Sequence, residues 1–262
     1  MGSGVLKQRI IPKFLISGGR LVKGIGFRDN MREAGNPVST ARVYDAYGTD
    51  ELMFLDIDAT PACRPPSGSV IERVSTEVFM PFTVGGGIRT LAQIESLLRS
   101  GADKVSINTA AIDDPAFVRQ AAARFGDQCI VVGIDYLCRP DGTRRVFSRC
   151  GTQETGHDPL EWARRMQDMH AGELMLCSIE RDGRMCGYDL DLLAEVASIL
   201  EVPVIASSGA GSLRDCADAL RTGVSAITVS SMFLFSDHSP IKLRTYLAGN
   251  GLPVRSQQGG HS

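Results

Sequence analysis

The segment Val84-Gly85-Gly86-Gly87-Ile88-Arg89 recurs, without a gap, 122 residues later as Ala206-Ser207-Ser208-Gly209-Ala210-Gly211. The correspondence continues through Thr109 in the first copy and Ser231 in the second. This offset is too long for a solenoid, whose repeats span about 20–50 residues. The repeat therefore predicts two half-domains built alike, each with a loop of small residues.

Length and composition limit the class of protein. The chain has 262 residues, of which 43% are hydrophobic and 22% charged, so it can bury the core of one barrel-sized domain. A net charge of −2 at pH 7 gives no electrostatic footprint for nucleic acid. The seven cysteines show no CxxC spacing, which favours a reducing compartment. Because the polar start resembles neither a signal peptide nor a membrane span, we expect a cytoplasmic protein without nucleic-acid or membrane partners.

One domain and two tails are expected. Residues 1–8 form the N-terminal tail, in which Gly-Ser-Gly is typical of a cloning remnant. Residues 9–252 form the domain, with halves of about 9–125 and 126–252. The Gln/Gly-rich residues 253–262 are expected to be a flexible tail.

Short apolar or β-branched runs alternate with helical patterns along the whole chain, as βα units do. The predicted strands are Arg9–Ile16, Leu52–Asp58, Phe82–Gly85, Lys104–Ile107, Cys129–Tyr136, Glu173–Ile179, Val204–Ser207 and Ala226–Val229. Predicted helices include Leu91–Ser100, Pro115–Phe125, Pro159–His170 and Leu213–Thr222. Eight such units predict a single (β/α)8 TIM barrel with a two-fold internal half-barrel repeat. A doubly wound open sheet is the alternative, but it does not account for two superimposable halves.

Two connections are longer than is usual between elements. Ser17 to Ser39 follows the first strand, and Arg139 to His157 follows the fifth as a hairpin turning at Pro140-Asp141-Gly142. Both leave the C-terminal ends of their strands, where barrel enzymes place their active sites. We expect both segments to cover a ligand.

The repeated loops are candidate phosphate sites, because unhindered backbone N–H groups between a strand and a helix suit an anion. The first site comprises Gly86, Gly87, Asn108 and Thr109, and the second comprises Ser208, Gly209, Gly211, Ser230 and Ser231. Alternatively, the glycines only allow tight turns. Two related loops on one barrel mouth favour a ligand with a phosphate at each end.

Several strings together carry a resemblance to a known family. They are Arg9-Ile10-Ile11-Pro12, Gly19-Arg20-Leu21-Val22-Lys23-Gly24, Phe54-Leu55-Asp56-Ile57, Pro81-Phe82-Thr83-Val84-Gly85-Gly86-Gly87-Ile88, Gly101-Ala102-Asp103-Lys104-Val105-Ser106-Ile107-Asn108-Thr109 and Arg181-Asp182-Gly183. From about Lys7 to Val254 the chain resembles the HisF family, the cyclase subunits of imidazole glycerol phosphate synthase.

The resemblance implies a partner and a reaction. A class I glutaminase of the HisH type would dock at the bottom of the barrel and release ammonia. The ammonia would cross the barrel to a bisphosphate nucleotide at the top, where two aspartates act as acid and base and an imidazole ring closes. Asp135 matches the strand 5 catalytic aspartate, and Lys23 matches the lysine of a mobile first loop. Asp182 and Gly183 match substrate-site positions.

At the other end of the barrel, the resemblance implies a charged gate for ammonia. Arg9, Glu51, Lys104 and Glu173 stand at strand starts and match that gate, whereas charged residues there are otherwise simply solvent-exposed. Asp103 matches a residue that faces the glutaminase.

The resemblance fails at the other catalytic aspartate. Aligning Arg9 to Gly24 needs no gap, and the position holds Leu15. Aligning Ile10 with Ile130 within the internal repeat also sets Leu15 opposite Asp135. A leucine cannot transfer a proton, and losing a general acid or base typically costs about 10²–10⁴ in rate.

Two further departures concern the barrel interior. Residues two apart on a strand share a face, so Lys13 points into the barrel on a regular strand, with its charge paired or its pKa lowered. Alternatively, a local twist lets Lys13 reach solvent. Cys177 replaces a threonine of the family's substrate site and is interpreted as a packing thiol, because no histidine is placed to activate it. Neither a metal site nor a cofactor is predicted.

Three functions remain open. The favoured hypothesis is a HisF-like subunit outside histidine synthesis, which delivers ammonia to a phosphorylated or nucleotide-linked acceptor. It resembles HisF-like proteins of bacterial surface-polysaccharide synthesis, which work with a glutaminase and a further amidotransferase to make acetamidino sugars. The alternatives are an imidazole glycerol phosphate synthase cyclase of histidine biosynthesis that tolerates Leu15, and a non-catalytic activator of the glutaminase.

Overall fold

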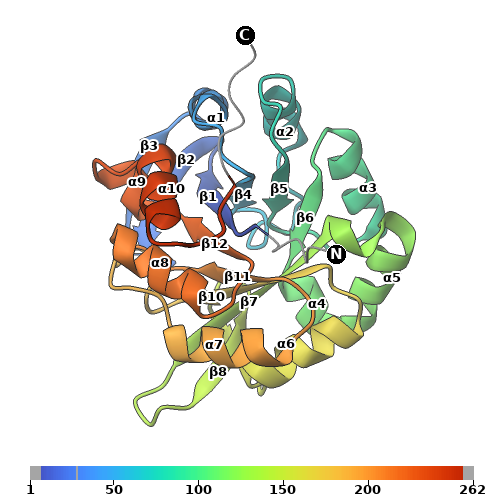
Figure 1. The fold of residues 1–262 in the computed structure, drawn as a ribbon. Helices are drawn as coiled ribbons and strands as arrows, with labels where there is room; N and C mark the ends of the chain where they lie inside the picture. Colours follow the sequence, from blue (N-terminus) through green and yellow to red (C-terminus); the bar gives the residue numbers. More distant parts are fainter. Residues whose placement is uncertain (1–6, 28, 256–262) are drawn as a thin grey trace, which may run out of the picture.

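Eight parallel strands close into a barrel in the computed structural model, which describes residues 7–27 and 29–255 (Figure 1). The strands are β1 (Arg9–Ser17), β4 (Leu52–Asp56), β5 (Phe82–Gly85), β6 (Lys104–Ile107), β7 (Ile130–Cys138), β10 (Glu173–Ser178), β11 (Val204–Ser207) and β12 (Ala226–Val229). They pair in this order, and β12 closes the ring by pairing with β1. The predicted TIM barrel is confirmed, and closure excludes the open sheet.

Ten helices are described, and they surround the barrel (Figure 1). They are α1 (Pro37–Ala46), α2 (Gly68–Ser75), α3 (Leu91–Arg99), α4 (Thr109–Asp113), α5 (Pro115–Phe125), α6 (Pro159–Asp168), α7 (Leu190–Ile199), α8 (Leu213–Arg221), α9 (Ser231–Phe235) and α10 (Pro240–Gly249). A short 3-10 turn, η1 (Asp127–Cys129), precedes β7. The main apolar core lies between the strands and this helical layer, and Trp162 of α6 is 1% exposed within it.

The internal repeat is also a repeat of local structure. Helices α3 and α8 begin with the same capping box, in which Thr90 and Ser212 cap their helices at the same offset as in the sequence. Asn108 and Ser230 precede α4 and α9 with nearly identical backbone angles, φ −129° and ψ −81° against φ −132° and ψ −82°. The two halves therefore share their turns as well as their elements.

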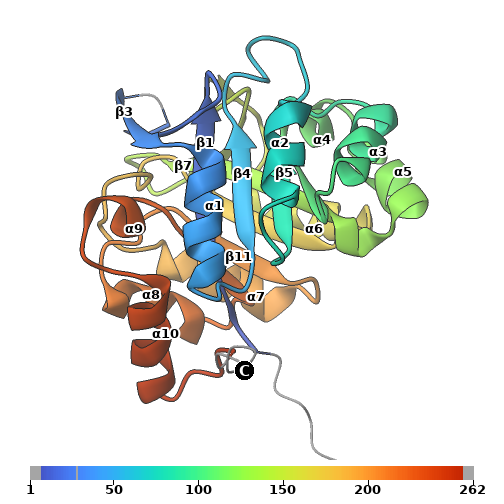
Figure 2. The same cartoon turned by 90° about the horizontal axis from the view of Figure 1, so that it is seen from above.

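Two extensions rise from the barrel strands. The segment after β1, expected as a long connection, instead forms β2 (Arg20–Ile25), which pairs antiparallel with β1, and β3 (Asp29–Gly35), which pairs antiparallel with β2. The predicted hairpin after β7 is present as β8 (Arg144–Ser148) with β9 (Gln153–Glu154), and its turn is closed by the Arg139 N–H donating to Thr143 O at 2.8 Å. In Figure 2, β3 lies at the end to which the arrows of β1 and β4 point.

The predicted tails fall largely outside the described residues, which omit 1–6 and 256–262. Within the described part, Gln8 pairs with Val254 in a parallel bridge, and its N–H donates to Pro253 O at 2.8 Å. This contact joins the two ends of the described chain at the N-terminal side of the barrel strands.

Six side chains fill the middle of the barrel: Ile11, Met53, Val131, Met175, Ile205 and Ala226. All are at most 3% exposed, and they pack on one another separately from the outer core. Their inward direction follows from the alternation of side chains along each strand. The barrel interior therefore has an apolar layer between its two polar ends.

Candidate active site

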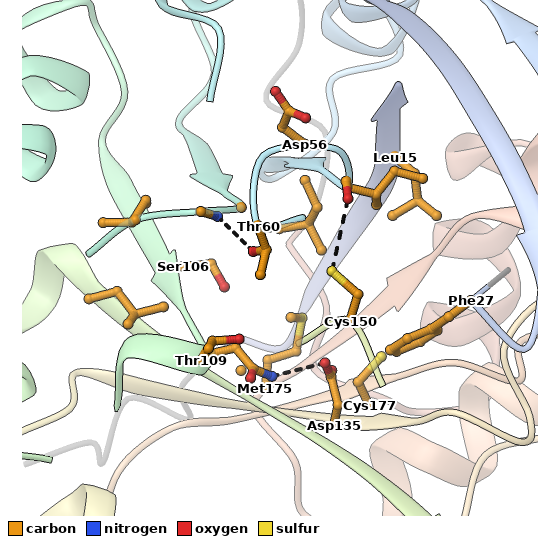
Figure 3. A pocket seen from close by; sticks show the side chains of 18 of the residues that line it. Leu15, Phe27, Asp56, Thr60, Ser106, Thr109, Asp135, Cys150, Met175 and Cys177 are labelled. Carbon is orange, nitrogen blue, oxygen red and sulfur yellow. Dashed lines mark hydrogen bonds between the residues drawn. The ribbon is translucent and has the colours of Figure 1, made fainter. Parts of the chain in front are cut away.

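A cavity of about 420 Å³ opens at the C-terminal ends of the strands (Figure 3). Its walls come from β1, β4, β6, β7 and β10, from the start of α4, and from the loops that follow β2, β4, β5, β6, β8 and β10. Residues with polar side chains on these walls are Lys13, Asp56, Thr60, Arg89, Ser106, Asn108, Thr109, Asp135, Cys150, Cys177 and Asp182. Leu15, Phe27, Leu55, Ile57 and Met175 supply apolar surface. The cavity is thus large enough for a small-molecule ligand, and its lining suits a ligand with both polar and apolar parts.

Asp135 is the carboxylate whose proton affinity suits chemistry near neutral pH. Burial at the cavity wall raises its pKa to about 7, although the charge of Lys13 and a hydrogen bond from Asn108 oppose the shift. Asn108 Nδ2 donates to Asp135 Oδ2 at 2.9 Å and thereby orients the carboxyl group. A carboxyl group with such a pKa can both accept and release a proton at neutral pH.

Leu15 lines the same cavity from β1, four strands away from β7 in either direction around the ring. It is 7% exposed and pairs with Leu55 of β4 and Val22 of β2. Figure 3 shows Leu15 and Asp135 on different walls of the cavity. The position opposite Asp135 therefore presents hydrocarbon, and any proton transfer there needs another group.

Asp56, on the neighbouring strand β4, is the acidic residue nearest to Leu15 in the strand order, and its carboxylate is already hydrogen-bonded. Its carboxylate accepts two hydrogen bonds from Arg64, at 2.7 and 3.2 Å, and two more from the N–H groups of Asp58 and Ala59. Asp58 in turn accepts hydrogen bonds from the Ser17 hydroxyl and from the Gly18 N–H, in the turn after β1. Both carboxylates thus stabilise the loop after β4.

The first predicted phosphate site borders the cavity. Gly86, Gly87, Asn108 and Thr109 all line it. However, a Cβ atom on Gly86 would overlap the backbone at the end of β4, and one on Gly87 would overlap the backbone of the loop after β4. The Gly87 N–H donates to Thr60 Oγ1 at 3.1 Å. Close packing alone accounts for these two glycines, so a phosphate at this site stays a prediction that rests on the position of the loop.

The second predicted phosphate site is closed. Gly183, Ser208, Gly209, Ser230 and Ser231 line a pocket with room for at most about one water molecule. Within the described residues, the buried Ser230 Oγ has no hydrogen-bond partner. Gly211 lies beside this pocket, where a Cβ atom would overlap backbone Met185. A phosphate here also stays a prediction.

A buried ion pair closes that pocket. Lys23 Nζ lies 2.5 Å from Asp182 Oδ2, and both side chains are less than 5% exposed. Ser208 Oγ donates to the other carboxylate oxygen at 3.2 Å. Burial, together with the charge of Lys13, lowers the pKa of Lys23. Lys23, expected in a mobile loop, therefore lies in β2 and ties this strand to the loop after β10.

Lys13 lies inside the barrel, where it is 3% exposed. Its Nζ donates to Ser207 Oγ at 2.7 Å and to Cys177 Sγ at 3.6 Å. Burial lowers its proton affinity, but electrostatic interactions with the Cys177 sulfur and with the Asp182 and Asp135 carboxyl groups outweigh burial and raise the pKa of Lys13. Burial raises the pKa of the Cys177 thiol, which is consistent with a packing role.

Four alternating charges form a closed ring at the opposite end of the barrel, which we call the charged ring: Arg9, Glu51, Lys104 and Glu173. Arg9 contacts Glu51 at 2.7 Å and Glu173 at 2.6 Å, and Lys104 contacts the same two carboxylates at 3.0 and 2.5 Å. Although burial acts in the other direction, hydrogen bonds from Arg9 and the nearby cations lower the pKa of Glu173. The ring covers the N-terminal end of the apolar layer.

Asp103 lies at this same end and is exposed. One of its carboxylate oxygens accepts a hydrogen bond from the Phe82 N–H at 2.9 Å. Its role toward a partner stays a prediction.

Several cavity residues were missed by the sequence reasoning. Phe27 follows β2 and Cys150 follows β8, and both have positive φ angles, 75° and 58°. Thr60 holds Gly87 through its hydroxyl. The two extensions bring Phe27 and Cys150 to the mouth of the cavity, whereas Thr60 comes from the loop after β4.

Two negative findings concern the described residues. No group of three His, Cys, Asp or Glu side chains within residues 7–27 and 29–255 is arranged to hold a metal ion. None of the helices described has the length and apolar character that crossing a membrane requires.

Fold and site together define a (β/α)8 barrel with a ligand-sized cavity at the end where such barrels carry their active sites. The family model described as "Histidine biosynthesis protein" matches residues 9–239. Over 252 residues the chain is 46% identical to the protein named "Imidazole glycerol phosphate synthase subunit HisF" of Dehalococcoides mccartyi, covering 96% of this chain and 99% of that one. The chain belongs to the HisF family.

Proposed function

We propose that this chain is the synthase subunit of a glutamine amidotransferase complex. A glutaminase docks at the charged ring, and its ammonia crosses the barrel to a phosphorylated acceptor in the cavity. The observation that carries the proposal is the arrangement of one closed barrel with the charged ring at one end, the cavity at the other, and six apolar side chains between them.

The interior suits ammonia rather than ammonium. Moving an unpaired ion into an apolar environment is costly, whereas a small neutral molecule avoids that cost. The charged ring must open for passage, because its four side chains contact one another around the entrance. We therefore expect glutaminase docking to loosen the ring.

The cavity suits an anionic ligand. Lys23 and Asp182 balance each other, while Lys13 and Arg89 add positive charge to the lining. Asp135, with its pKa near 7, offsets only part of this charge at neutral pH. A phosphorylated acceptor would complement the surplus.

Two acceptors are candidates. The name of the relative in Dehalococcoides mccartyi favours the imidazole glycerol phosphate synthase reaction, on a phosphoribulosyl formimino bisphosphate nucleotide. Leu15 favours an acceptor of another kind, as in the amidation of surface-polysaccharide sugars with a further amidotransferase, because only Asp135 remains of the family's acid and base pair. A purely non-catalytic activator would need neither the cavity nor a tuned carboxyl group.

The deciding experiment supplies ammonia and the formimino bisphosphate nucleotide to the wild type, Leu15→Asp and Asp135→Asn, and follows loss of the nucleotide. Turnover by the wild type that Asp135→Asn abolishes supports the histidine-pathway reaction. Turnover only by Leu15→Asp supports a different natural acceptor. Stimulation of a glutaminase without binding or turnover of the nucleotide by any variant would favour the non-catalytic activator.

Partner docking is tested separately. We expect Asp103→Lys to weaken binding of a HisH-type glutaminase, because it reverses an exposed charge at the ring end. The matched control is Asp141→Lys, in the exposed turn after β7 at the other end of the barrel. Equal glutaminase affinity for both variants would contradict docking at this surface.

A further inference from the structure

Lys13 stands at the boundary between the apolar layer and the cavity. Along β1, Arg9 belongs to the charged ring, Ile11 to the apolar layer, and Leu15 to the cavity wall. Because these residues alternate with outward ones, Lys13 occupies the interior level between the layer and the mouth. Under the proposed function, ammonia leaving the apolar layer meets the Lys13 side chain before the acceptor.

The amine of Lys13 also joins the two cavities. Lys13 and Asp182 are the two residues that line both the large cavity and the small pocket at the second predicted phosphate site. Its contact Ser207 accepts a further hydrogen bond from Thr228 at 2.9 Å. The ammonium therefore lies against the ligand space and is held from behind by hydroxyl groups.

This ammonium has only neutral direct contacts. Among residues 7–27 and 29–255, its hydrogen-bond partners are the Ser207 hydroxyl and the Cys177 thiol, whereas Asp182 is paired with Lys23 and Asp135 with Asn108. A buried charge without a direct counter-ion is costly to the fold. Such a group is a candidate for binding an anion that arrives with the ligand.

We propose that the Lys13 ammonium binds the acceptor oxygen that becomes negatively charged as ammonia adds. This inference rests on the proposed function and extends it to an acceptor that presents a carbonyl carbon at the floor of the cavity. Lys13 would supply the electrostatic stabilisation that a preorganised donor gives to a developing oxyanion.

The addition step balances with the residues present. The ammonia nitrogen bonds to the carbonyl carbon, and the C=O π pair moves to the oxygen, which accepts a hydrogen bond from Lys13 Nζ. The Asp135 carboxylate takes a proton from the new N–H₃⁺ group and returns it to the oxygen. The product is a neutral carbinolamine, and Asp135 is again ionised.

One test needs no turnover. Formate, the smallest carboxylate, is titrated at constant ionic strength while the ¹⁵N resonance of Lys13 Nζ and the methyl resonance of Met175, in the same cavity, are recorded. We expect a saturable shift of both signals in the wild type. In Lys13→Met the apparent affinity read from Met175 should fall at least about 10-fold, whereas Lys13→Arg should retain most of it. Lys242→Met, on exposed α10, is the matched control and should not change it.

The second test follows the ammonia-dependent reaction of the formimino bisphosphate nucleotide. Loss of one oxyanion donor typically lowers kcat by about 10²–10³, so Lys13→Met should show this loss with KM for the nucleotide nearly unchanged. A raised KM with unchanged kcat would overturn the inference, because Lys13 would then bind the ground state only. Equal turnover by the wild type and Lys13→Met would also overturn it.

Failure of the inference can be told from failure of the proposed function. Formate binding through Lys13 without nucleotide turnover would reject this acceptor and retain the anion site. Turnover of the nucleotide without formate-induced shifts of Lys13 Nζ in the wild type would retain the function and reject the anion site. Because the Lys13 signal is read in the wild type, this result does not depend on the folding of a variant.

Discussion

Asp135→Asn should stabilise the protein, and the gain should grow with pH. The carboxyl group of Asp135 has an ordinary pKa of 3.8, which burial raises to about 7 in the folded chain. Between these two values the folded state holds a proton that the unfolded state has released. Wild-type stability therefore falls as pH rises from about 4 to about 7, and asparagine removes this term.

The magnitude follows from the same shift. A difference of about three pH units, at ~1.4 kcal/mol each, sets an upper limit of about 4 kcal/mol above pH 7. Partial exposure reduces this figure, so we expect about 2–4 kcal/mol at pH 8 and little difference at pH 4. For a domain of this size the change corresponds to a rise in Tm of about 5–15 °C at pH 8.

Thermal and urea unfolding at half-unit steps between pH 5 and pH 8 measure the effect. Asp141→Asn is the control, because hydrogen bonds from Thr143 lower the pKa of this exposed carboxyl group. The control should give no gain that increases with pH. A stability difference between Asp135→Asn and the wild type that stays constant from pH 5 to pH 8 would refute the argument.

Four further variants test other parts of the structure. Asp182→Asn should destabilise by about 3–5 kcal/mol in urea unfolding, because Lys23 loses its buried counter-ion; a loss below about 1 kcal/mol would contradict this. Gly142 has a positive φ and open space around it, so Gly142→Ala should lower the free energy of unfolding by about 1–2 kcal/mol. Gly87 also has a positive φ, but a Cβ atom there would overlap the loop after β4, so Gly87→Ala should lower the free energy of unfolding by about 2 kcal/mol more. Lys104→Met removes one cation of the charged ring and should lower glutamine-dependent turnover more than ammonia-dependent turnover when both are assayed with the glutaminase.

The barrel could be predicted because its strands are continuous apolar runs. Phe82–Gly85, Lys104–Ile107, Val204–Ser207 and Ala226–Val229 were predicted with the bounds observed, and the other barrel strands differ by at most two residues at an end. Parallel strands buried on both faces produce this strong signal. Strand β3 was missed because five of its seven residues are exposed, so its sequence resembles a loop.

The site was less predictable because its polar contacts join distant parts of the chain. The ion pair between Lys23 and Asp182 spans 159 residues and forms only because β2 folds back over the loop after β10. The inward direction of Lys13 follows from strand alternation, but its contacts with Ser207 and Cys177 depend on the packing of three strands. Sequence patterns specify which face of a strand a side chain occupies, but they do not specify which distant residue that side chain contacts.

The two halves of the barrel share a skeleton but differ in charge. The offset of 122 residues equates Gly86 with Ser208, and both have positive φ, 108° and 77°, because the same turn must be made twice. The buried pair of Lys23, from the first half, and Asp182, from the second, covers the loop of the second half, and Ser208 donates to that pair. A ligand with a phosphate at each end, as the sequence predicts, would therefore meet one open end and one end covered by an ion pair, so the asymmetry of the side chains, rather than the fold, would determine the orientation in which it binds.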